Sequence, residues 1–177
     1  LLMNPVLVGF TLYKAALALD EAHNLKSSTG KKLNLVHRSL SPSNILYNDK
    51  AGIIKLSDFG MATLDDQDLS ADKLRGKPSY MAPEQIKTAK AVTAQTDVYG
   101  VAATLYHMLS GHPPYEGSGA IEIIMKVGVL PIKPLLKYNN ELPIELCEII
   151  HRALSFELED RYTSALQFKD LLGKFLK

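Results

Sequence analysis

A chain of 177 residues, 46% hydrophobic and 22% charged, has the length and composition of one globular domain with its own hydrophobic core. Its formal net charge of +1 gives no reason to expect a nucleic acid or an anionic membrane as a partner. The single cysteine, Cys147, excludes an internal disulfide and a zinc site built on several cysteines. We therefore expect one domain over residues 1–177, in the reducing environment of the cytoplasm.

The first element expected is a helix over residues 5–23. Apolar side chains recur there at helical spacing, and Pro5 stands where a first helical turn tolerates proline. No basic segment precedes this run, and Lys14 interrupts it, which argues against a signal peptide and against a membrane-spanning helix. A polar loop is expected over residues 24–32.

Three short apolar runs are predicted to be β-strands. They cover residues 33–36, 45–47 and 53–56. The second and third runs are separated by a polar turn at 48–52, so they should pair as a hairpin. Asp58 follows the last run, and the strand should fix its backbone while its side chain faces a cleft.

The remaining elements are predicted to be helices, so the chain should be mainly α-helical, with about six helices in all. They cover residues 83–87, 93–110, 120–127, 143–154 and 164–176. The helix over 93–110 has Thr93 as a candidate N-cap and ends before Gly111. Because it is apolar on nearly every side, we expect it in the middle of the core.

Three short motifs lie between residues 37 and 84. They are HRSL at 37–40 with Asn44 after it, DFG at 58–60 and APE at 82–84. The three have the order and spacing of the H-R-D-L-x-x-x-N, D-F-G and A-P-E motifs of protein kinases. The chain therefore resembles the protein kinase family. The GKPSYMAPE segment at 76–84 resembles the G-T-P-x-Y-M-A-P-E segment of bacterial and eukaryotic serine/threonine kinases. The SPSN segment at 41–44 and the long loop before the expected strand over 33–36 look most like the bacterial branch.

The resemblance implies the mainly helical C-terminal lobe of a kinase, with a few short strands around the catalytic and D-F-G loops. The sequence contains no G-x-G-x-x-G loop and no V-A-I-K strand, so we expect the N-terminal lobe to be absent from this chain. Asn44 and Asp58 match the positions that bind the metal and the cofactor. The resemblance thus implies Mg²⁺ and ATP if an N-terminal lobe is supplied, and no cofactor otherwise.

Other positions match structural residues of the family. They are His37, Arg38, Phe59, Gly60, Glu84, Asp97 and Arg161. By resemblance, His37 should pack under Phe59, and Glu84 should pair with Arg161 in the interior. Asp97 should accept hydrogen bonds from the backbone of the catalytic loop.

Arg38 matches an arginine that binds a phosphate on the activation loop of regulated kinases. Here the loop carries Asp65, Asp66, Asp68 and Asp72. Either one of these carboxylates takes the place of the phosphate, or the loop is simply a solvated acidic segment.

Ser39, Ser41 and Lys77 depart from the family pattern at what would be catalytic positions. By resemblance, Ser39 replaces the catalytic aspartate, Ser41 replaces a lysine, and Lys77 replaces a threonine that bonds both of those residues in active kinases. A serine hydroxyl is not ionised near pH 7, and losing a general base typically costs about 10²–10⁴ in rate. The three positions should form one cluster, which is typical of an abandoned site.

Two functions are compatible with this pattern. The first is a pseudokinase, a protein-binding, scaffolding or regulatory module with little or no phosphotransfer. The alternative is part of an active serine/threonine kinase that transfers phosphate from ATP, with Mg²⁺, to protein hydroxyls. A Ser-His-Asp hydrolase built on His37, Ser39 and Asp58 is disfavoured, because the sequence has no G-x-S-x-G elbow.

The partner expected is a protein. The surface that would face an N-terminal lobe should be partly apolar and covered by another chain or by a second copy. A peptide is expected to dock on the segment Gly76–Glu84, beside the helix over 120–127. Neither a nucleic acid nor a membrane is expected as a partner.

Overall fold

The computed structural model describes residues 4–48, 50–59, 77–87 and 92–175 of the chain. Regular structure within these residues consists of six α-helices and one sheet of two strands, besides short 3₁₀ turns. The elements are α1 (Pro5–His23), β1 (Ile45–Asn48), β2 (Ile53–Leu56), α2 (Pro83–Lys87), α3 (Ala94–Ser110), α4 (Ala120–Lys126), α5 (Ile144–Ala153) and α6 (Ala165–Phe175). The prediction of a mainly helical fold with a few short strands is confirmed.

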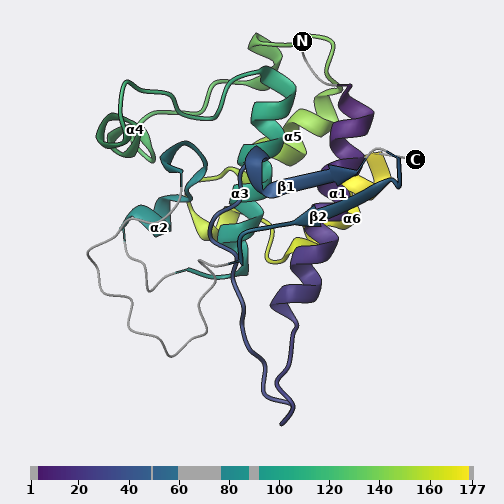
Figure 1. Cartoon of the computed structure of the whole chain (residues 1–177). Helices are drawn as coiled ribbons and strands as arrows, with labels where there is room; N and C mark the ends of the chain where they lie inside the picture. The colour runs from purple at the N-terminus through teal and green to yellow at the C-terminus, as the bar shows by residue number, and fades with distance from the viewer. Residues whose placement is uncertain (1–3, 49, 60–76, 88–91, 176–177) are drawn as a thin grey trace.

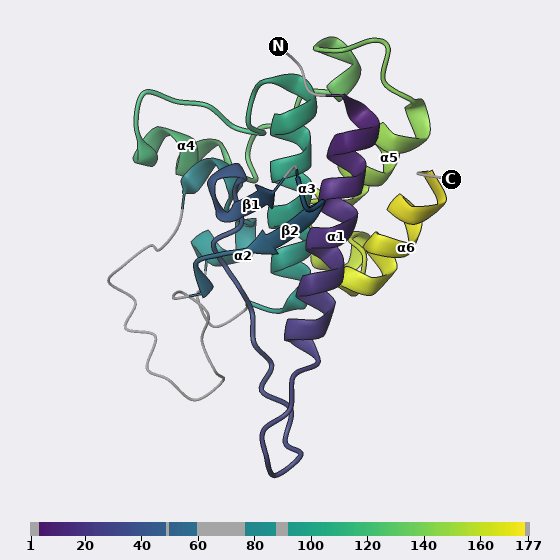
Figure 2. The same ribbon diagram turned by 45° about the vertical axis from the view of Figure 1, so that its right-hand side comes forward.

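The helix α3 lies at the centre of a bundle and contacts α1, α5 and α6 (Figures 1 and 2). Side chains on several sides of this helix are buried, and Val98 and Leu105 are two of them. Thr93 caps the N-terminus in a capping box with Thr96, and Gly111 ends the helix with a φ of 78°. The prediction that this helix occupies the core is therefore confirmed.

The helix α1 packs along α3 and α6. The Asn4 side chain caps it by accepting hydrogen bonds from two backbone N–H groups of the first turn, in which Pro5 stands. Leu12 and Leu19 are fully buried, so the apolar run at the start of the chain is a core helix. Among the described residues, no helix has the length and apolarity needed to cross a membrane.

The strands β1 and β2 form the predicted antiparallel hairpin, with Ile45 opposite Leu56 and Asn48 opposite Ile53. The hairpin lies across the front of the bundle, and β2 contacts α1 (Figure 1). Asp58 follows the end of β2, as the sequence indicated. The hairpin therefore holds this carboxylate at one side of the bundle.

The strand predicted over residues 33–36 is wrong. This segment is not a strand, and Asn34 has a φ of 45°. A left-handed residue interrupts the extended backbone that the alternation of apolar residues indicated. The loop before it carries an isolated bridge between Lys26 and Lys32, and it extends away from the bundle below α1 (Figure 2).

A half-buried histidine, His151, should make stability depend on pH. The Leu135 N–H donates to His151 Nε2 over 3.1 Å, and burial lowers the pKa of His151. The folded chain therefore binds a proton on His151 more weakly than the unfolded chain, in which histidine has a pKa of about 6.5. Neutral His151 contributes its full stabilisation of the folded state above that pH, and this contribution is lost as the pH falls toward the lowered pKa.

We expect the free energy of unfolding to fall between about pH 7.5 and pH 5, as measured by denaturant titration. The His151→Gln variant should reduce this slope, and the matched variant of the exposed His112, His112→Gln, should keep it. His107 should preserve part of the slope in both variants, because burial lowers its pKa as well. A His151→Gln variant with an unchanged slope would refute the assignment.

Candidate functional site

Asp97, in the first turn of α3, holds the backbone of the HRSL segment. Its Oδ2 accepts a hydrogen bond from the His37 N–H over 2.8 Å, and its Oδ1 accepts one from the Arg38 N–H over 2.9 Å. His23 Nε2 donates to the same Oδ2 over 2.7 Å. Asp97 is 1% exposed, so the end of α1, the HRSL segment and α3 meet at one buried carboxylate.

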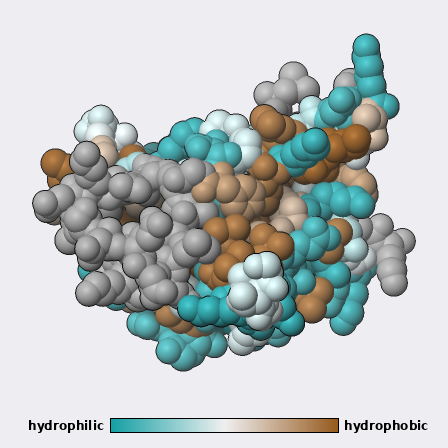
Figure 3. Space-filling model, turned by 60° about the horizontal axis from the view of Figure 1, so that its bottom comes forward, coloured by the Kyte–Doolittle hydropathy of each residue, from teal (hydrophilic) through white to brown (hydrophobic). Residues whose placement is uncertain are grey.

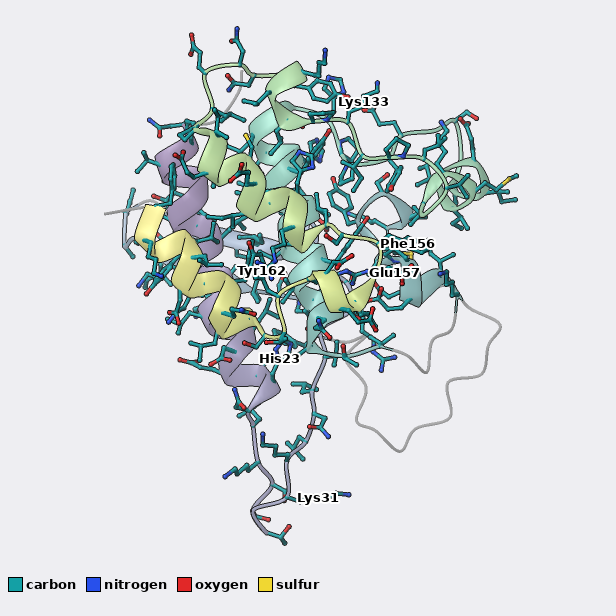
Figure 4. The ribbon with its side chains drawn as sticks, turned by 180° about the vertical axis from the view of Figure 1, so that it is seen from behind. His23, Lys31, Lys133, Phe156, Glu157 and Tyr162 are labelled. Carbon is teal, nitrogen blue, oxygen red and sulfur yellow. The ribbon has the colours of Figure 1, made fainter. Side chains whose placement is uncertain are left out.

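The sequence did not indicate the contact of His23 with Asp97. His23 is the last residue of α1, at the lower end of that helix in Figure 4. Its partner, Asp97, lies 74 residues further along the chain. No ligand spacing or local motif points to such a pair, because only the packing of α1 on α3 brings the two side chains together.

Arg38 and Asp58 both have a left-handed backbone, with a φ of 67° at each residue. This conformation costs a residue with a side chain roughly 1–2 kcal/mol, and it persists where the surroundings impose it. At Arg38, Asp97 holds the N–H, and Gln85 Nε2 donates to the carbonyl oxygen over 2.9 Å. Strained backbone of this kind gathers at functional sites, and here it lies in the two loops that carry the first and second motifs.

His37 joins these two loops. Its side chain is fully buried, and its Nε2 donates to the Ser57 carbonyl oxygen over 2.9 Å. Its Nδ1 accepts from the Ser39 N–H over 3.3 Å, and its ring centroid lies 4.3 Å from that of Phe59. Both ring nitrogens are therefore used inside the fold, as expected of a structural residue.

Gly100 allows α3 to approach the HRSL segment closely. A Cβ at this position would lie 2.9 Å from the Leu40 Cβ, which is closer than packed carbon atoms lie. Leu40 is 4% exposed. The absence of a side chain at Gly100 therefore sets how the loop rests on the central helix.

Ser39, which by resemblance replaces an aspartate, is hydrogen-bonded to Asn44. The Asn44 Nδ2 donates to the Ser39 carbonyl oxygen over 2.7 Å and to the Ser39 Oγ over 3.4 Å. Because a carbonyl oxygen only accepts, the nitrogen end of the amide points to Ser39. The Asn44 Oδ1 is then the atom that another donor or a cation would meet.

Ser43 links the residues around it into one network. Lys77 Nζ donates to the Ser43 Oγ over 2.6 Å, and the Ser41 Oγ lies 3.0 Å from it. The Ser43 Oγ also lies 3.3 Å from the Asn44 Oδ1. Ser39, Ser41 and Lys77 are thus brought together through Asn44 and Ser43. Sequence reasoning missed Ser43, since no spacing rule indicates contact with a residue 34 positions away.

Asn44 and Asp58 are the residues that could hold a divalent cation. Amide and carboxylate oxygens are ligands that Mg²⁺ prefers, and water and phosphate usually supply its other ligands. In the described ranges, no group of three or more His, Cys, Asp or Glu residues is arranged to hold a metal. Asn44 and Asp58 supply fewer ligands than Mg²⁺ needs, so water and a phosphate would have to complete the coordination of an ion bound by them.

Glu84 and Arg161 form a buried pair. Arg161 Nη1 and Nη2 donate to Glu84 Oε1 and Oε2, each over 2.9 Å. Thr96 Oγ1 donates to the same Oε1 over 2.8 Å. Arg161 also donates to the carbonyl oxygens of Ser155 and Phe156. These contacts tie α2 to α3 and to the connection between α5 and α6, where Figure 4 labels Phe156.

Some residues singled out in the sequence lie outside the described residues. They are Gly60, Gly76 and the acidic residues between 65 and 72. The pairing of Arg38 with one of those aspartates stays a prediction. The segment expected to bind a peptide is described from Lys77 onward, and Gln85 Oε1 fixes it locally by accepting from the Ala82 N–H over 3.0 Å.

A comparison with known families matches residues 9–172 to the protein kinase domain. The chain belongs to the protein kinase family. The tyrosine-protein kinase MasK of Myxococcus xanthus is 35% identical over 167 residues, which are 93% of this chain and 26% of MasK. The serine/threonine-protein kinase Pkn1 of Myxococcus xanthus is 33% identical over 144 residues, which are 78% of this chain and 21% of Pkn1.

This member of the protein kinase family spans about a quarter of the length of these two relatives. Their names also differ in the acceptor, which is tyrosine for one relative and serine or threonine for the other. Membership of the family accounts for the order of the three motifs along the chain. What the departures at Ser39, Ser41 and Lys77 mean for function depends on the contacts that these residues make in this chain.

Proposed function

We propose that this chain is a pseudokinase lobe, a protein-binding or regulatory module of the kinase family with little or no phosphotransfer. The observation that carries the proposal is the bonding at Ser39. By resemblance Ser39 replaces the catalytic aspartate, and its hydroxyl accepts a hydrogen bond from Asn44.

A serine at this position is a poor proton acceptor. Phosphotransfer to a hydroxyl needs a group that orients the acceptor and takes up its proton. A serine hydroxyl needs an adjacent general base before it can act in proton transfer. Losing a positioned base typically costs about 10²–10⁴ in rate, which is enough to turn an ordinary kinase into a protein without useful activity.

The alternative is part of an active protein kinase. Asn44 and Asp58 support it, because both carry side-chain oxygens of the kind that would bind the Mg²⁺ that neutralises the phosphates of ATP. The names of the relatives support it as well. In that case the acceptor would be a protein hydroxyl, and the positioning of the substrates alone would sustain the remaining rate.

Two exposed apolar surfaces suit a protein partner. The helix α4 and the turn after it expose Ile121, Met125 and Val129, and α4 contacts the turn over Pro78–Tyr80. The hairpin exposes Leu46 on β1. Hydrophobic residues also gather in a patch on the face shown in Figure 3. We assign the α4 surface, with the segment 77–84, to a peptide, and the hairpin surface to a protein partner or a second copy.

The experiment that tests the proposal is a phosphotransfer assay with labelled ATP and Mg²⁺. The samples are this chain and the longest natural form of the protein that contains it, each with a generic basic protein as acceptor. We expect both samples to match their Asp58→Ala variants at the level of background. Transfer by the natural form that disappears in Asp58→Ala would favour the active kinase.

A further inference from the structure

We propose that Ser39, Ser41, Ser43 and Lys77 form a binding site for a phosphate monoester, the group carried by a phosphorylated serine or threonine side chain. We call these four residues the hydroxyl–lysine cluster. The inference rests on the proposed function, because a bound phosphate would occupy the place where an active kinase holds its catalytic carboxylate.

The charge of the hydroxyl–lysine cluster favours an anion. Lys77 Nζ contacts the neutral Ser43 hydroxyl over 2.6 Å, and within the described residues it forms no ion pair with a carboxylate. Relative to the family pattern, Ser39 removes a negative charge and Lys77 adds a positive one, while Ser41 removes a positive one. The cluster is therefore more positive by one charge than in the pattern it departs from.

The cluster also has protons to offer. The ammonium group of Lys77 has three N–H donors, one of which is used on Ser43. The Ser39 Oγ accepts from Asn44, and its own O–H finds no acceptor among residues that the structure describes. Phosphate oxygens accept several hydrogen bonds, and those from a charged donor are about twice as strong as neutral ones.

The positions of these donors are fixed by the fold. Ser43 lies in the 3₁₀ turn Pro42–Asn44, and Lys77 directly precedes the turn Pro78–Tyr80. Ser41 is 1% exposed, and its hydroxyl forms a hydrogen bond with the Ser43 hydroxyl over 3.0 Å. A site whose donors are already held in place loses less entropy on binding.

A peptide is the source of phosphate that the surroundings favour. Ser43 and Lys77 are exposed, so that a ligand reaches them from solvent. Lys77 begins the described part of the segment assigned above to a peptide, and α4 lies against the turn that follows. The terminal phosphate of a nucleotide has the same chemistry, and the experiment separates the two sources.

The test measures binding by fluorescence anisotropy with the 177-residue chain. The probe is a labelled peptide that carries one phosphoserine and no other charge, and the control probe is its unphosphorylated form. We expect saturable binding of the phosphopeptide below about 1 mM, competition by inorganic phosphate, and no binding of the control. ADP without Mg²⁺ that binds while the phosphopeptide does not would overturn the assignment to a peptide.

Matched variants connect the binding to the cluster. Lys77→Gln and Ser39→Asp should each weaken it by about tenfold or more, since one removes the cation and the other adds a like charge. Lys137→Gln, at an exposed lysine outside the cluster, should stay within about twofold. Circular dichroism checks that each variant is folded.

Equal binding by the Lys77→Gln variant and the unmodified chain would overturn the site, as would equal affinity for the two forms of the peptide. Neither result would contradict the proposed function, because the phosphotransfer assay tests that function separately. Transfer activity in the unmodified natural form would remove the proposed function and leave the binding data to be read on their own.

Discussion

Replacing Arg161 by leucine is expected to lower the free energy of unfolding by about 3–5 kcal/mol. The reason is that the variant leaves the Glu84 carboxylate buried without its cation. Glu84 is 7% exposed and Arg161 is 1% exposed, so water does not replace the lost partner. The carbonyl oxygens of Ser155 and Phe156 lose their donor as well. Denaturant titration with a constant m-value would measure the loss.

Two further variants separate the pair from its surroundings. Replacing both partners together, with Glu84→Leu and Arg161→Met, should recover part of the loss, because no buried charge is then unpaired. The half-exposed pair of Glu122 and Lys126 is the matched control, and Glu122→Gln should lower the unfolding midpoint far less than Arg161→Leu does. A single Arg161→Leu variant as stable as the unmodified chain would show that the buried pair is not needed.

Replacing Asp97 by alanine should lower the free energy of unfolding by about 2–5 kcal/mol. The backbone N–H groups of His37 and Arg38 then lose the carboxylate oxygens that accept their hydrogen bonds. A buried donor without an acceptor costs about 1–3 kcal/mol, and here two of them are affected. The left-handed backbone at Arg38 loses a hydrogen bond that holds it, while the one from Gln85 remains.

The matched variant is Asp97→Asn, whose Oδ1 still accepts one of these hydrogen bonds. It should lose roughly half as much stability as Asp97→Ala. Denaturant titration again provides the measurement, and hydrogen exchange at the His37 and Arg38 amides localises the effect. If Asp97→Ala cost less than about 1 kcal/mol, the carboxylate would not be the anchor of the loop.

Much of the fold was predictable because its signals are local. Thr93 and Gly111 mark the ends of α3 by their capping chemistry, and the even spread of apolar residues between them predicts a helix inside the core. The hairpin followed from two apolar runs around a polar turn. The strand expected over 33–36 failed because Asn34 adopts a positive φ, which alternation of residue types does not reveal.

The candidate site was predictable where motif spacing fixes the positions and not where packing does. The meeting of Glu84 with Arg161 was expected from the family pattern. The contacts of His23, Ser43 and Gln85 were not, because each joins segments that the sequence holds far apart. Such contacts depend on how helices and loops pack, and no local spacing encodes them.

The most direct measurement of the central claim compares phosphotransfer by the longest natural form carrying Ser39 with that of its Ser39→Asp variant. With labelled ATP and Mg²⁺, we expect the unmodified protein to stay at the background of Asp58→Ala. The Ser39→Asp variant should exceed that background by about 10²–10⁴, because the missing base is restored in a loop that keeps Asn44, with Asp58 still present. Equal and Asp58-dependent transfer by the two forms would contradict the claim that Ser39 disables the site.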